Sequence, residues 1–391
     1  MSLRFVLIVF FSFVFNAGYA ALLIWLLRRR KPWLKMIGFA VGLWAMAMTG
    51  LFLAQLFTPI PWQPWMRHWL YFPMAAEMAW NVFLPLVTLP AIILLALVIN
   101  RARPVSRSTS ELKPEDLSRR KFLYTLACGA APVVALGMGV HGSLTRNDLR
   151  VRPISIPIAN LPPELEGFSI AHVSDLHSGL FVGPERLKII SDTTNDLKTD
   201  LVTITGDIIN RDMQEFYPAL LAIKAIESRH GTYLCEGNHD CIPGDRLIID
   251  ACAENNLPML SYQTIVLPIR GKRLLIGGLP WMKNGFEDHP ELVSQLFPAR
   301  QEGDVRILLA HHPHLFDIAQ SSTDLVLTGH THGGQIMLGD HLGFGPFFYK
   351  YWSGLYRAGA SSLVVSNGCG DWFPCRIGAP AEIAHLRLTR A

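Results

Sequence analysis

Hydrophobic and polar positions follow two different patterns along the chain, and the pattern changes near residue 150. Before that point, apolar residues form long and almost uninterrupted runs; from residue 168 onward, short β-branched runs alternate with helical patterns. A helix that is apolar on all sides over roughly 20 residues is typical of a membrane span. The first pattern therefore predicts a transmembrane region, and the second predicts a globular α/β domain.

Four apolar runs in the first part are long enough to cross a bilayer. A stretch between the second and third, TPIPWQPWMRHWLYFP, is rich in Trp and Pro, which is typical of an interfacial loop. The predicted spans are Phe5–Leu27, Met36–Phe57, Trp80–Ile99 and Phe122–Val140. We expect a three-helix module at 1–103, a cytoplasmic linker at 104–117, a fourth helix at 118–142 and a catalytic domain at 150–391.

Lysine and arginine are concentrated in two short loops of this region. RRRKPWLK has a net charge of +5 and RARPVSRSTSELKPEDLSRRK a net charge of +4, against +4 for the whole chain, so the remainder sums to about −5. Basic loops favour the cytoplasmic side. The pattern predicts a multi-pass protein of the inner membrane with its catalytic domain on the extracytoplasmic side. The rest of the chain is acidic and therefore lacks the basic surface with which a protein binds nucleic acid.

The six residues SRRKFL, at 118–123, precede the fourth apolar run. They resemble a twin-arginine export signal, which would make the export machinery a partner and would carry a folded domain across the membrane. A simpler alternative is that the basic residues anchor the helix on its cytoplasmic side. No convincing cleavage site follows, so we expect the segment to be retained.

Six cysteines occur without a CxxC pair or a regular spacing, which indicates neither a zinc ribbon nor a disulfide framework. We expect free thiols, because a domain of this size buries a sufficient core without disulfides. A bond between Cys369 and Cys375 is the alternative if the domain is exported. Cys128 is expected within the fourth helix.

Seven short runs in the second part predict strands alternating with helices, and hence central sheets. They are FSIAHV, LVTIT, TYLCE, RLLIGG, VRILLA, DLVLT and SLVVS. Five of them end in polar clusters, which is where α/β folds commonly place their sites. The clusters are SDLH with Asp175 and His177, TGDIIN with Asp207, EGNHD with Asn238, His239 and Asp240, LLAHHPH with His311, His312 and His314, and TGHTHGG with His330 and His332.

The donors in these clusters favour a particular kind of metal. Imidazole nitrogens combined with carboxylate and carboxamide oxygens suit divalent Mn, Fe, Zn, Co or Ni, whereas calcium takes oxygen alone and structural zinc prefers thiolates. Two such ions can clamp the oxygens of an in-line displacement at phosphorus and lower the pKa of a bridging water. The clusters therefore predict a site with two divalent ions.

The series D-x-H, G-D, G-N-H-D, H and G-H-T-H resembles the calcineurin-like metallophosphoesterase superfamily over about 170–391. GHTHGGQI, SGLY and PCRIGAPAEIAHLRL look more narrowly like bacterial transmembrane proteins with a metallophosphoesterase domain. The resemblance implies a four-layer α/β/β/α sandwich and hydrolysis by a metal-activated hydroxide. It also implies a first ion on Asp175, His177, Asp207 and His332, and a second on Asp207, Asn238, His311 and His330.

By the same resemblance, His239 would contact the phosphoryl oxygen or protonate the leaving group, and Asp240 would orient it. His172, within a strand, is expected in the core, and His312 and His314 in ordinary loop roles, with substrate contact by one of them as the alternative. We expect a membrane-anchored phosphodiesterase or pyrophosphatase acting on a lipid-linked or cell-envelope substrate. Two alternatives are a cytosolic-face UDP-2,3-diacylglucosamine pyrophosphohydrolase of lipid A synthesis and a non-catalytic metal-binding sensor.

Overall fold

The structure is a computed structural model that describes residues 137–391, apart from 283–289, 340, 341, 344 and 373. Ten further helical positions are described singly or in pairs between residues 14 and 134. The chain divides into two compact units, Met1–Ser143 and Leu144–Ala391. The four predicted spans, except for a few positions, lie outside the described residues. So do the interfacial loop, the linker at 104–117, SRRKFL and Cys128.

The structure contradicts the predicted inner-membrane location with an extracytoplasmic catalytic domain. Crossing a bilayer takes roughly 20 predominantly apolar residues in one helix. No helix among the described positions is long and apolar enough to do so. The transmembrane region that the sequence predicted ahead of the α/β domain is therefore unsupported.

The first sheet of the second unit has five strands in the order β1-β13-β2-β3-β4. Strands β2, β3 and β4 run parallel to one another, and β13 pairs antiparallel with β2 and parallel with β1. The strands are β1 (Leu149–Ile158), β2 (Ser169–Val173), β3 (Leu201–Thr205), β4 (Thr232–Cys235) and β13 (Ala381–Arg390). The helices associated with this sheet are α5 (Pro184–Asp196), α6 (Phe216–Lys224) and α7 (Leu247–Glu254).

The second sheet has six strands in the order β11-β12-β8-β7-β6-β5, of which β12, β8, β7 and β6 are parallel. The strands are β5 (Gln263–Ile269), β6 (Lys272–Gly278), β7 (Val305–Leu309), β8 (Leu325–Thr328), β11 (Gly354–Ala358) and β12 (Ser361–Val365). Helices α8 (Pro290–Gln295) and α9 (Phe316–Ala319) accompany it. A separate hairpin, β9 (Met337–Gly339) and β10 (Leu342–Gly343), leads into the short helix α10 (Gly345–Phe348).

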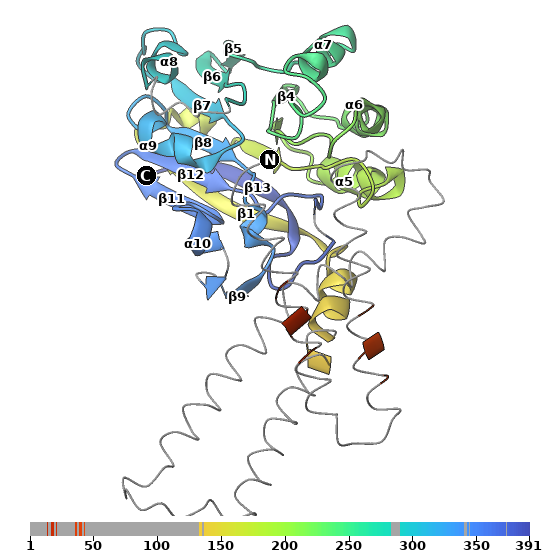
Figure 1. Ribbon diagram of the computed structural model, residues 1–391. Coiled ribbons are helices and arrows are strands. Elements are labelled where there is room, and N and C mark those ends of the chain that lie inside the picture. The colour runs from red at the N-terminus through yellow and green to blue at the C-terminus, as the bar shows by residue number, and fades with distance from the viewer. Residues whose placement is uncertain are drawn as a thin grey trace, which may run out of the picture. The chain divides into compact units, whose positions relative to one another are not determined.

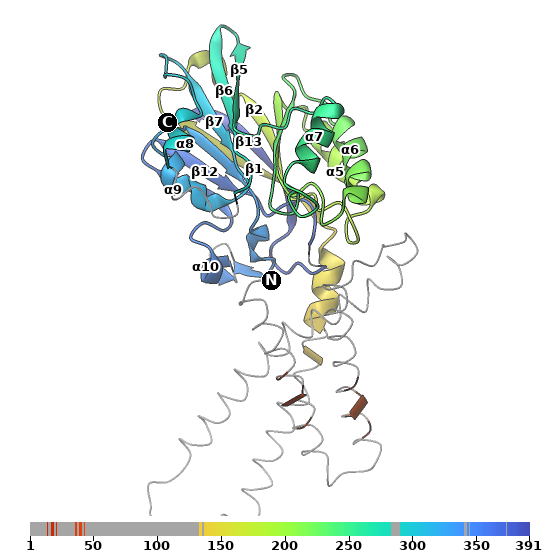
Figure 2. The ribbon, with the colours of Figure 1, turned by 45° about the horizontal axis from the view of Figure 1, so that its top comes forward.

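Alternate residues of the strands face different layers, which explains why the buried strands are apolar on both faces. In β7, Ile307 and Leu309 join a core that also contains Ile170 and Leu201 of the first sheet, so this core lies between the sheets. The intervening Leu308 packs in a separate core with residues of α8 and α9. Helices α5, α6 and α7 cover the outer face of the first sheet, and α8 and α9 lie beside the second (Figures 1 and 2).

Helix α5 illustrates how the sequence positions these outer helices. It begins at Pro184, whose fixed φ and missing N–H suit the first turn of a helix. Its buried residues recur at intervals of three and four, as expected for one helical face: Leu187, Ile190, Ser191 and Thr194. The remaining positions are polar or exposed, so the helix packs on the sheet through a single stripe.

All five cysteines among the described residues are free, including Cys369 and Cys375, which confirms the prediction for them. Burial raises the pKa of both of these thiols to about 12. They are therefore protonated near neutral pH.

Candidate metal centre

The predicted ligands lie just past the carboxyl ends of strands in both sheets. Asp175, Asp207 and Asn238 follow β2, β3 and β4, which are adjacent and parallel in the first sheet. His311 and His330 follow β7 and β8, which are adjacent and parallel in the second. Because the carboxyl ends of parallel strands share one edge of a sheet, the two facing sheets bring these side chains to one place.

Five of the predicted ligands adopt a left-handed backbone conformation. Their φ angles lie between 44° and 69°, a region that residues other than glycine seldom occupy. Each such residue costs of order 1–3 kcal/mol, and strain of this kind clusters at functional sites. The residues are Asp175, His177, Asp207, His330 and His332. The strained backbone conformation of these loops is therefore associated with the positions of the five predicted ligand side chains.

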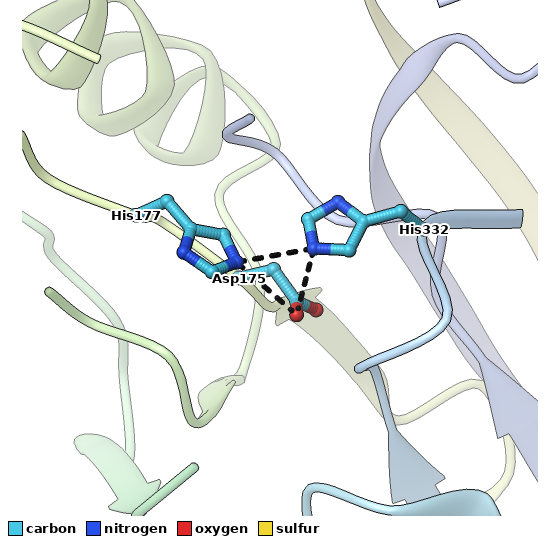
Figure 3. A group of neighbouring side chains, drawn as sticks. All are labelled: Asp175, His177 and His332. Carbon is cyan, nitrogen blue, oxygen red and sulfur yellow. Dashed lines mark hydrogen bonds and ion pairs between the residues drawn. The ribbon is translucent and has the colours of Figure 1, made fainter. Parts of the chain in front are cut away.

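Asp175, His177 and His332 form a first cluster, which is buried (Figure 3). His332 Nε2 lies 3.2 Å from Asp175 Oδ1 and 3.1 Å from His177 Nε2. The distance from His177 Nε2 to Asp175 Oδ1 is 3.9 Å. Figure 3 shows the two rings directed toward one another beside the carboxylate. One carboxylate and two imidazoles thus converge on a single position.

Asp207, His311 and His330 form a second cluster, which Asn238 completes. His311 Nε2 lies 3.2 Å from Asp207 Oδ2 and 3.1 Å from His330 Nδ1. The side-chain oxygen of Asn238 is 3.1 Å from His311 Nε2 and 2.8 Å from His330 Nδ1. The two clusters together contain all seven of the residues predicted as ligands.

Asp207 connects the two clusters. Its Oδ2 lies 3.2 Å from His311 Nε2 in the second cluster and 3.5 Å from His177 Nε2 in the first. Its Oδ1 accepts a hydrogen bond of 2.8 Å from the backbone N–H of His239. One carboxylate oxygen therefore faces ligand atoms of both clusters.

Small residues allow the loops to approach this closely. A Cβ on Gly237 would overlap Asp207 Oδ1, and a Cβ on Gly329 would overlap Ser174 Oγ and Asp175 Oδ2. Ser174 Oγ in turn donates a hydrogen bond of 2.6 Å to Asp175 Oδ2. Glycine is required at both positions for the observed spacing of the carboxylates.

The arrangement of donors fits divalent cations. The ligand atoms of each three-residue group lie within 4.8 Å of one another, and the donor set is imidazole and carboxylate without thiolate. The ring atom of His177 that faces both clusters is Nε2, which lies 3.9 Å from Asp175 Oδ1 and 3.5 Å from Asp207 Oδ2. Buried charges and buried imidazoles are stable when they are paired or coordinate a metal. The residues present thus fit a metal at each cluster.

Electrostatics within the clusters point the same way. Burial would raise the pKa of Asp207, but His311 and His239 outweigh it and hold that pKa well below its usual range. Burial would lower the pKa of His311, but Asp207 raises it to about 10. Burial lowers the pKa of His330, so its imidazole is neutral, as a metal ligand must be. A cation bound at the second cluster would replace the proton of His311.

A ring nitrogen of His239 lies within 4.8 Å of ligand atoms of His177 and Asp207, so His239 borders both clusters. His239 Nδ1 donates to the carbonyl oxygen of Asn210 at 2.5 Å. Asp240 instead accepts bonds from the backbone N–H groups of Ile208, at 2.8 Å, and Gly237, at 2.8 Å. Asp240 therefore connects the loops after β3 and β4, and the ring of His239 contacts the Asn210 carbonyl and the ring of His177. Burial, reinforced by Asp207, raises the pKa of Asp240 to about 7.

Two aromatic residues beside the second cluster were not predicted from the sequence. The ring of Trp281 stacks on His330 with 6.0 Å between centroids, and Tyr349 packs edge-on against the same ring at 5.6 Å. The hydroxyl of Tyr349 is 3.4 Å from His330 Nε2, and the backbone N–H of Trp281 donates to Glu236 Oε1 at 2.9 Å. Neither position has a metal-binding side chain, so no sequence signal marked it.

Arg376 was also missed as a functional residue, although it lies in the quoted PCRIG stretch. Its guanidinium is buried and paired with Asp371 at 2.5 Å. It also donates to the carbonyl oxygens of Asn367 and Gly370, and its Nη2 lies 3.1 Å from His332 Nδ1. The arginine therefore fixes the ring of a predicted ligand from behind.

The remaining histidines lie close to their predicted places. His172 is buried within β2, and its Nε2 is 2.9 Å from Thr205 Oγ1, which confirms its expected core position. His312 and His314 face one another with 2.9 Å between their Nδ1 atoms. The ring of His312 lies 4.4 Å from that of His330, so substrate contact by His312 stays open as an alternative.

Comparison with known proteins agrees with this site. Residues 168–334 match the family model of the calcineurin-like phosphoesterases. The chain is 31% identical over 284 residues to an uncharacterized metallophosphoesterase of Helicobacter pylori, covering 69% of this chain and 72% of that protein. It is 30% identical over 290 residues to the uncharacterized metallophosphoesterase YkuE of Bacillus subtilis, covering 70% and 98%. It is 27% identical over 284 residues to the phosphodiesterase YaeI of Escherichia coli, covering 70% and 99%.

The chain belongs to the calcineurin-like metallophosphoesterase family and is a metal-dependent phosphoesterase. The broad resemblance predicted from the D-x-H, G-D, G-N-H-D, H and G-H-T-H series is thereby confirmed. The narrower likeness to bacterial transmembrane proteins remains a prediction.

Proposed function

We propose that this protein is a phosphodiesterase that uses two divalent ions held between the two sheets. The observation that supports this most directly is the position of Asp207 Oδ2, which faces ligand atoms of both clusters. A carboxylate in that position could bind two neighbouring ions. Two ions can stabilise the attacking and leaving oxygens of an in-line displacement at phosphorus. The Escherichia coli relative is named a phosphodiesterase, which favours the diester class.

Asp175, His177 and His332 would hold one ion, and Asn238, His311 and His330 the other, with Asp207 shared. When bound, the ions supply positive charge against the phosphoryl oxygens and lower the pKa of water to produce the hydroxide nucleophile. The donor set suits any of five divalent metals: Mn, Fe, Zn, Co or Ni.

His239 is the proposed catalytic residue of the chain. Its Nδ1–H donates to the Asn210 carbonyl, which leaves Nε2 as the ring atom available to substrate. The ring packs edge-on against His177 with 4.6 Å between centroids, so it borders the first cluster. Its Nε2 would contact a phosphoryl oxygen or donate a proton to the leaving oxygen. Asp240 is a positioning residue that holds the loop on which His239 lies.

The type of phosphate bond that is cleaved is a separate part of the proposal. A pyrophosphate bond, as in the lipid A precursor named above, offers the same phosphoryl oxygens to the two clusters. The alternative of a non-catalytic sensor is set aside, because the chain is a metal-dependent phosphoesterase. The two remaining alternatives differ in their products, so one set of assays separates them.

The test is hydrolysis by the purified full chain loaded with Mn²⁺. We expect turnover of bis(p-nitrophenyl) phosphate, less turnover of UDP-2,3-diacylglucosamine, and loss of both in Asp207→Asn. Asp192→Asn is the control, because Asp192 is an exposed carboxylate paired with Lys188 on the same helix, α5. Faster cleavage of the nucleotide sugar would favour the pyrophosphatase. Turnover unaffected by Asp207→Asn would overturn the proposed site.

A further inference from the structure

Four large apolar side chains are exposed together just after the metal-binding sequence GHTHGG. Leu338 is 71% exposed, Leu342 62%, Phe347 80% and Phe348 72%. We call these four residues the apolar hairpin surface; they belong to β9, β10 and α10. The segment from 337 to 349 contains only one formally charged residue, Asp340. Figures 1 and 2 show β9 and α10 outside the layers of the sandwich.

Such exposure is unfavourable unless something covers it. Burial of a Leu or Phe side chain is favourable, so four that stay exposed forgo a substantial stabilisation. Single exposed apolar residues are ordinary, whereas contiguous ones mark binding surfaces. The apolar hairpin surface is therefore a candidate binding surface for an apolar ligand.

The base of the hairpin is firmly attached to the domain. Met337 and Trp352 are buried with Ala379 in a small core of their own. Trp352 also accepts, through its carbonyl oxygen, a hydrogen bond of 2.6 Å from Thr331 Oγ1, between the two histidines of the metal motif. The exposed side chains thus project from a fixed base.

Tyr349 links the segment that carries this surface to the metal centre. This residue directly follows Phe348, and its hydroxyl lies 3.4 Å from Nε2 of His330 in the second cluster. Tyr349 also packs against His312, with 5.9 Å between ring centroids. Successive Cα atoms are only about 3.8 Å apart, so apolar surface begins within one residue of a side chain that contacts a predicted ligand.

We propose that the apolar hairpin surface binds the hydrocarbon chain of an amphiphilic phosphodiester whose phosphate occupies the metal centre. This rests on the proposed function, since it assigns the substrate class of the same site. A ligand with a phosphate at the two clusters and a saturated chain on one ester oxygen matches both features at once. The near absence of charge in the hairpin favours a hydrocarbon chain over a polar group.

The test uses p-nitrophenyl alkyl phosphodiesters with methyl, butyl and octyl chains, each kept monomeric in solution. For the full chain with Mn²⁺ we expect kcat/KM to rise with chain length, by up to about fourfold for each methylene that becomes buried. The double variant Phe347→Ser, Phe348→Ser should flatten this rise and leave the methyl ester unchanged. The matched control is Tyr217→Ser, Leu221→Ser, which replaces two side chains on α6 that are 65% and 53% exposed.

The outcomes separate the inference from the proposed function. A rise with chain length that persists in the Phe347, Phe348 variant, or that is lost equally in the α6 control, overturns the inference. Hydrolysis of the methyl ester without any chain-length dependence overturns the inference alone. A dimer of the full chain that dissociates in the double variant assigns the surface to a second copy and also overturns it. Absence of all turnover overturns the proposed function, and the inference falls with it.

Discussion

The two sheets contribute different chemistry to the metal centre. The loops after the first sheet provide both carboxylates, Asp175 and Asp207, together with one amide and one imidazole, those of Asn238 and His177. The loops after the second sheet provide imidazoles alone, from three histidines: His311, His330 and His332. Each cluster combines side chains from both sheets. The site therefore exists only when the two sheets are packed together.

This division explains how buried carboxylates are tolerated. Asp175 and Asp207 are both buried, and an isolated buried charge is strongly unfavourable. Burial would raise the pKa of Asp175, but His332 and His311, from the opposite sheet, lower it overall. Bound ions would take over this compensation and would join the two sheets directly.

The largest effect is expected where one side chain serves both clusters. Asp207→Asn should lower kcat/KM for bis(p-nitrophenyl) phosphate on the order of 10³-fold, because metal charge contributes several kcal/mol to the transition state. His330→Gln, which alters a ligand of only one cluster, should lose about 10²-fold. Steady-state kinetics at saturating Mn²⁺ measures both. Equal losses would show that Asp207 is not shared.

His239→Gln tests a residue of the first sheet that holds no proposed ion. We expect a loss of about 10²-fold with methyl phenyl phosphate, a typical contribution of a positioned acid. The loss should be smaller with methyl p-nitrophenyl phosphate, because p-nitrophenolate leaves without a proton. Equal losses would favour contact with a phosphoryl oxygen instead. His385→Gln, on β13, is the control, and unchanged rates in the His239 variant would exclude both roles.

Much of this arrangement could be predicted from the sequence. All seven predicted strand runs are confirmed to within one residue at each end, for example LVTIT as Leu201–Thr205. These strands are buried on both faces and so appear as short apolar runs. The long strands β1 and β13 were missed, because they alternate with polar residues and β1 contains Pro153 and Pro157.

The site could be predicted only as far as side-chain chemistry marks it. Metal-binding residue types at strand ends marked eleven candidates, and the family resemblance selected from them the seven that form the two clusters. The contacts of Asp240 with the backbone, and the approach of Trp281 and Tyr349 to His330, depend on loop conformation and long-range packing. The left-handed backbone at the ligands likewise has no signature in residue type, since Asp and His tolerate it without requiring it.

Arg376→Gln tests whether Arg376, in the loop between β12 and β13, holds the ring of His332 in place. We expect the metal affinity of the first cluster to fall about 10- to 100-fold, as is typical when a partner of a ligand is removed. Asp371→Asn breaks the same buried ion pair without touching His332 and is the matched control. Titration with Mn²⁺ compares the two variants, and excess metal should restore activity to the Arg376 variant. An equal fall in affinity in both would indicate a general loss of stability.

Metal removal should have the smallest effect, on stability. At free metal tenfold above Kd, each ion stabilises the folded state by about 1.4 kcal/mol, so two ions together shift Tm by about 6–11 °C in a unit of this size. Chelation should lower Tm by that amount, and added Mn²⁺ should restore it. If the chelator left Tm unchanged, the ions would not be stabilising the packing of the two sheets.

The most direct test of the central claim is the number of ions bound per chain. Metal content would be measured by mass spectrometry on the purified full chain after loading with Mn²⁺ and removal of free ions. We predict two ions in the wild type and one in each of His332→Gln and His330→Gln, which alter different clusters. A wild-type content of one ion or none, or two ions retained in both variants, would contradict a centre shared between the two sheets.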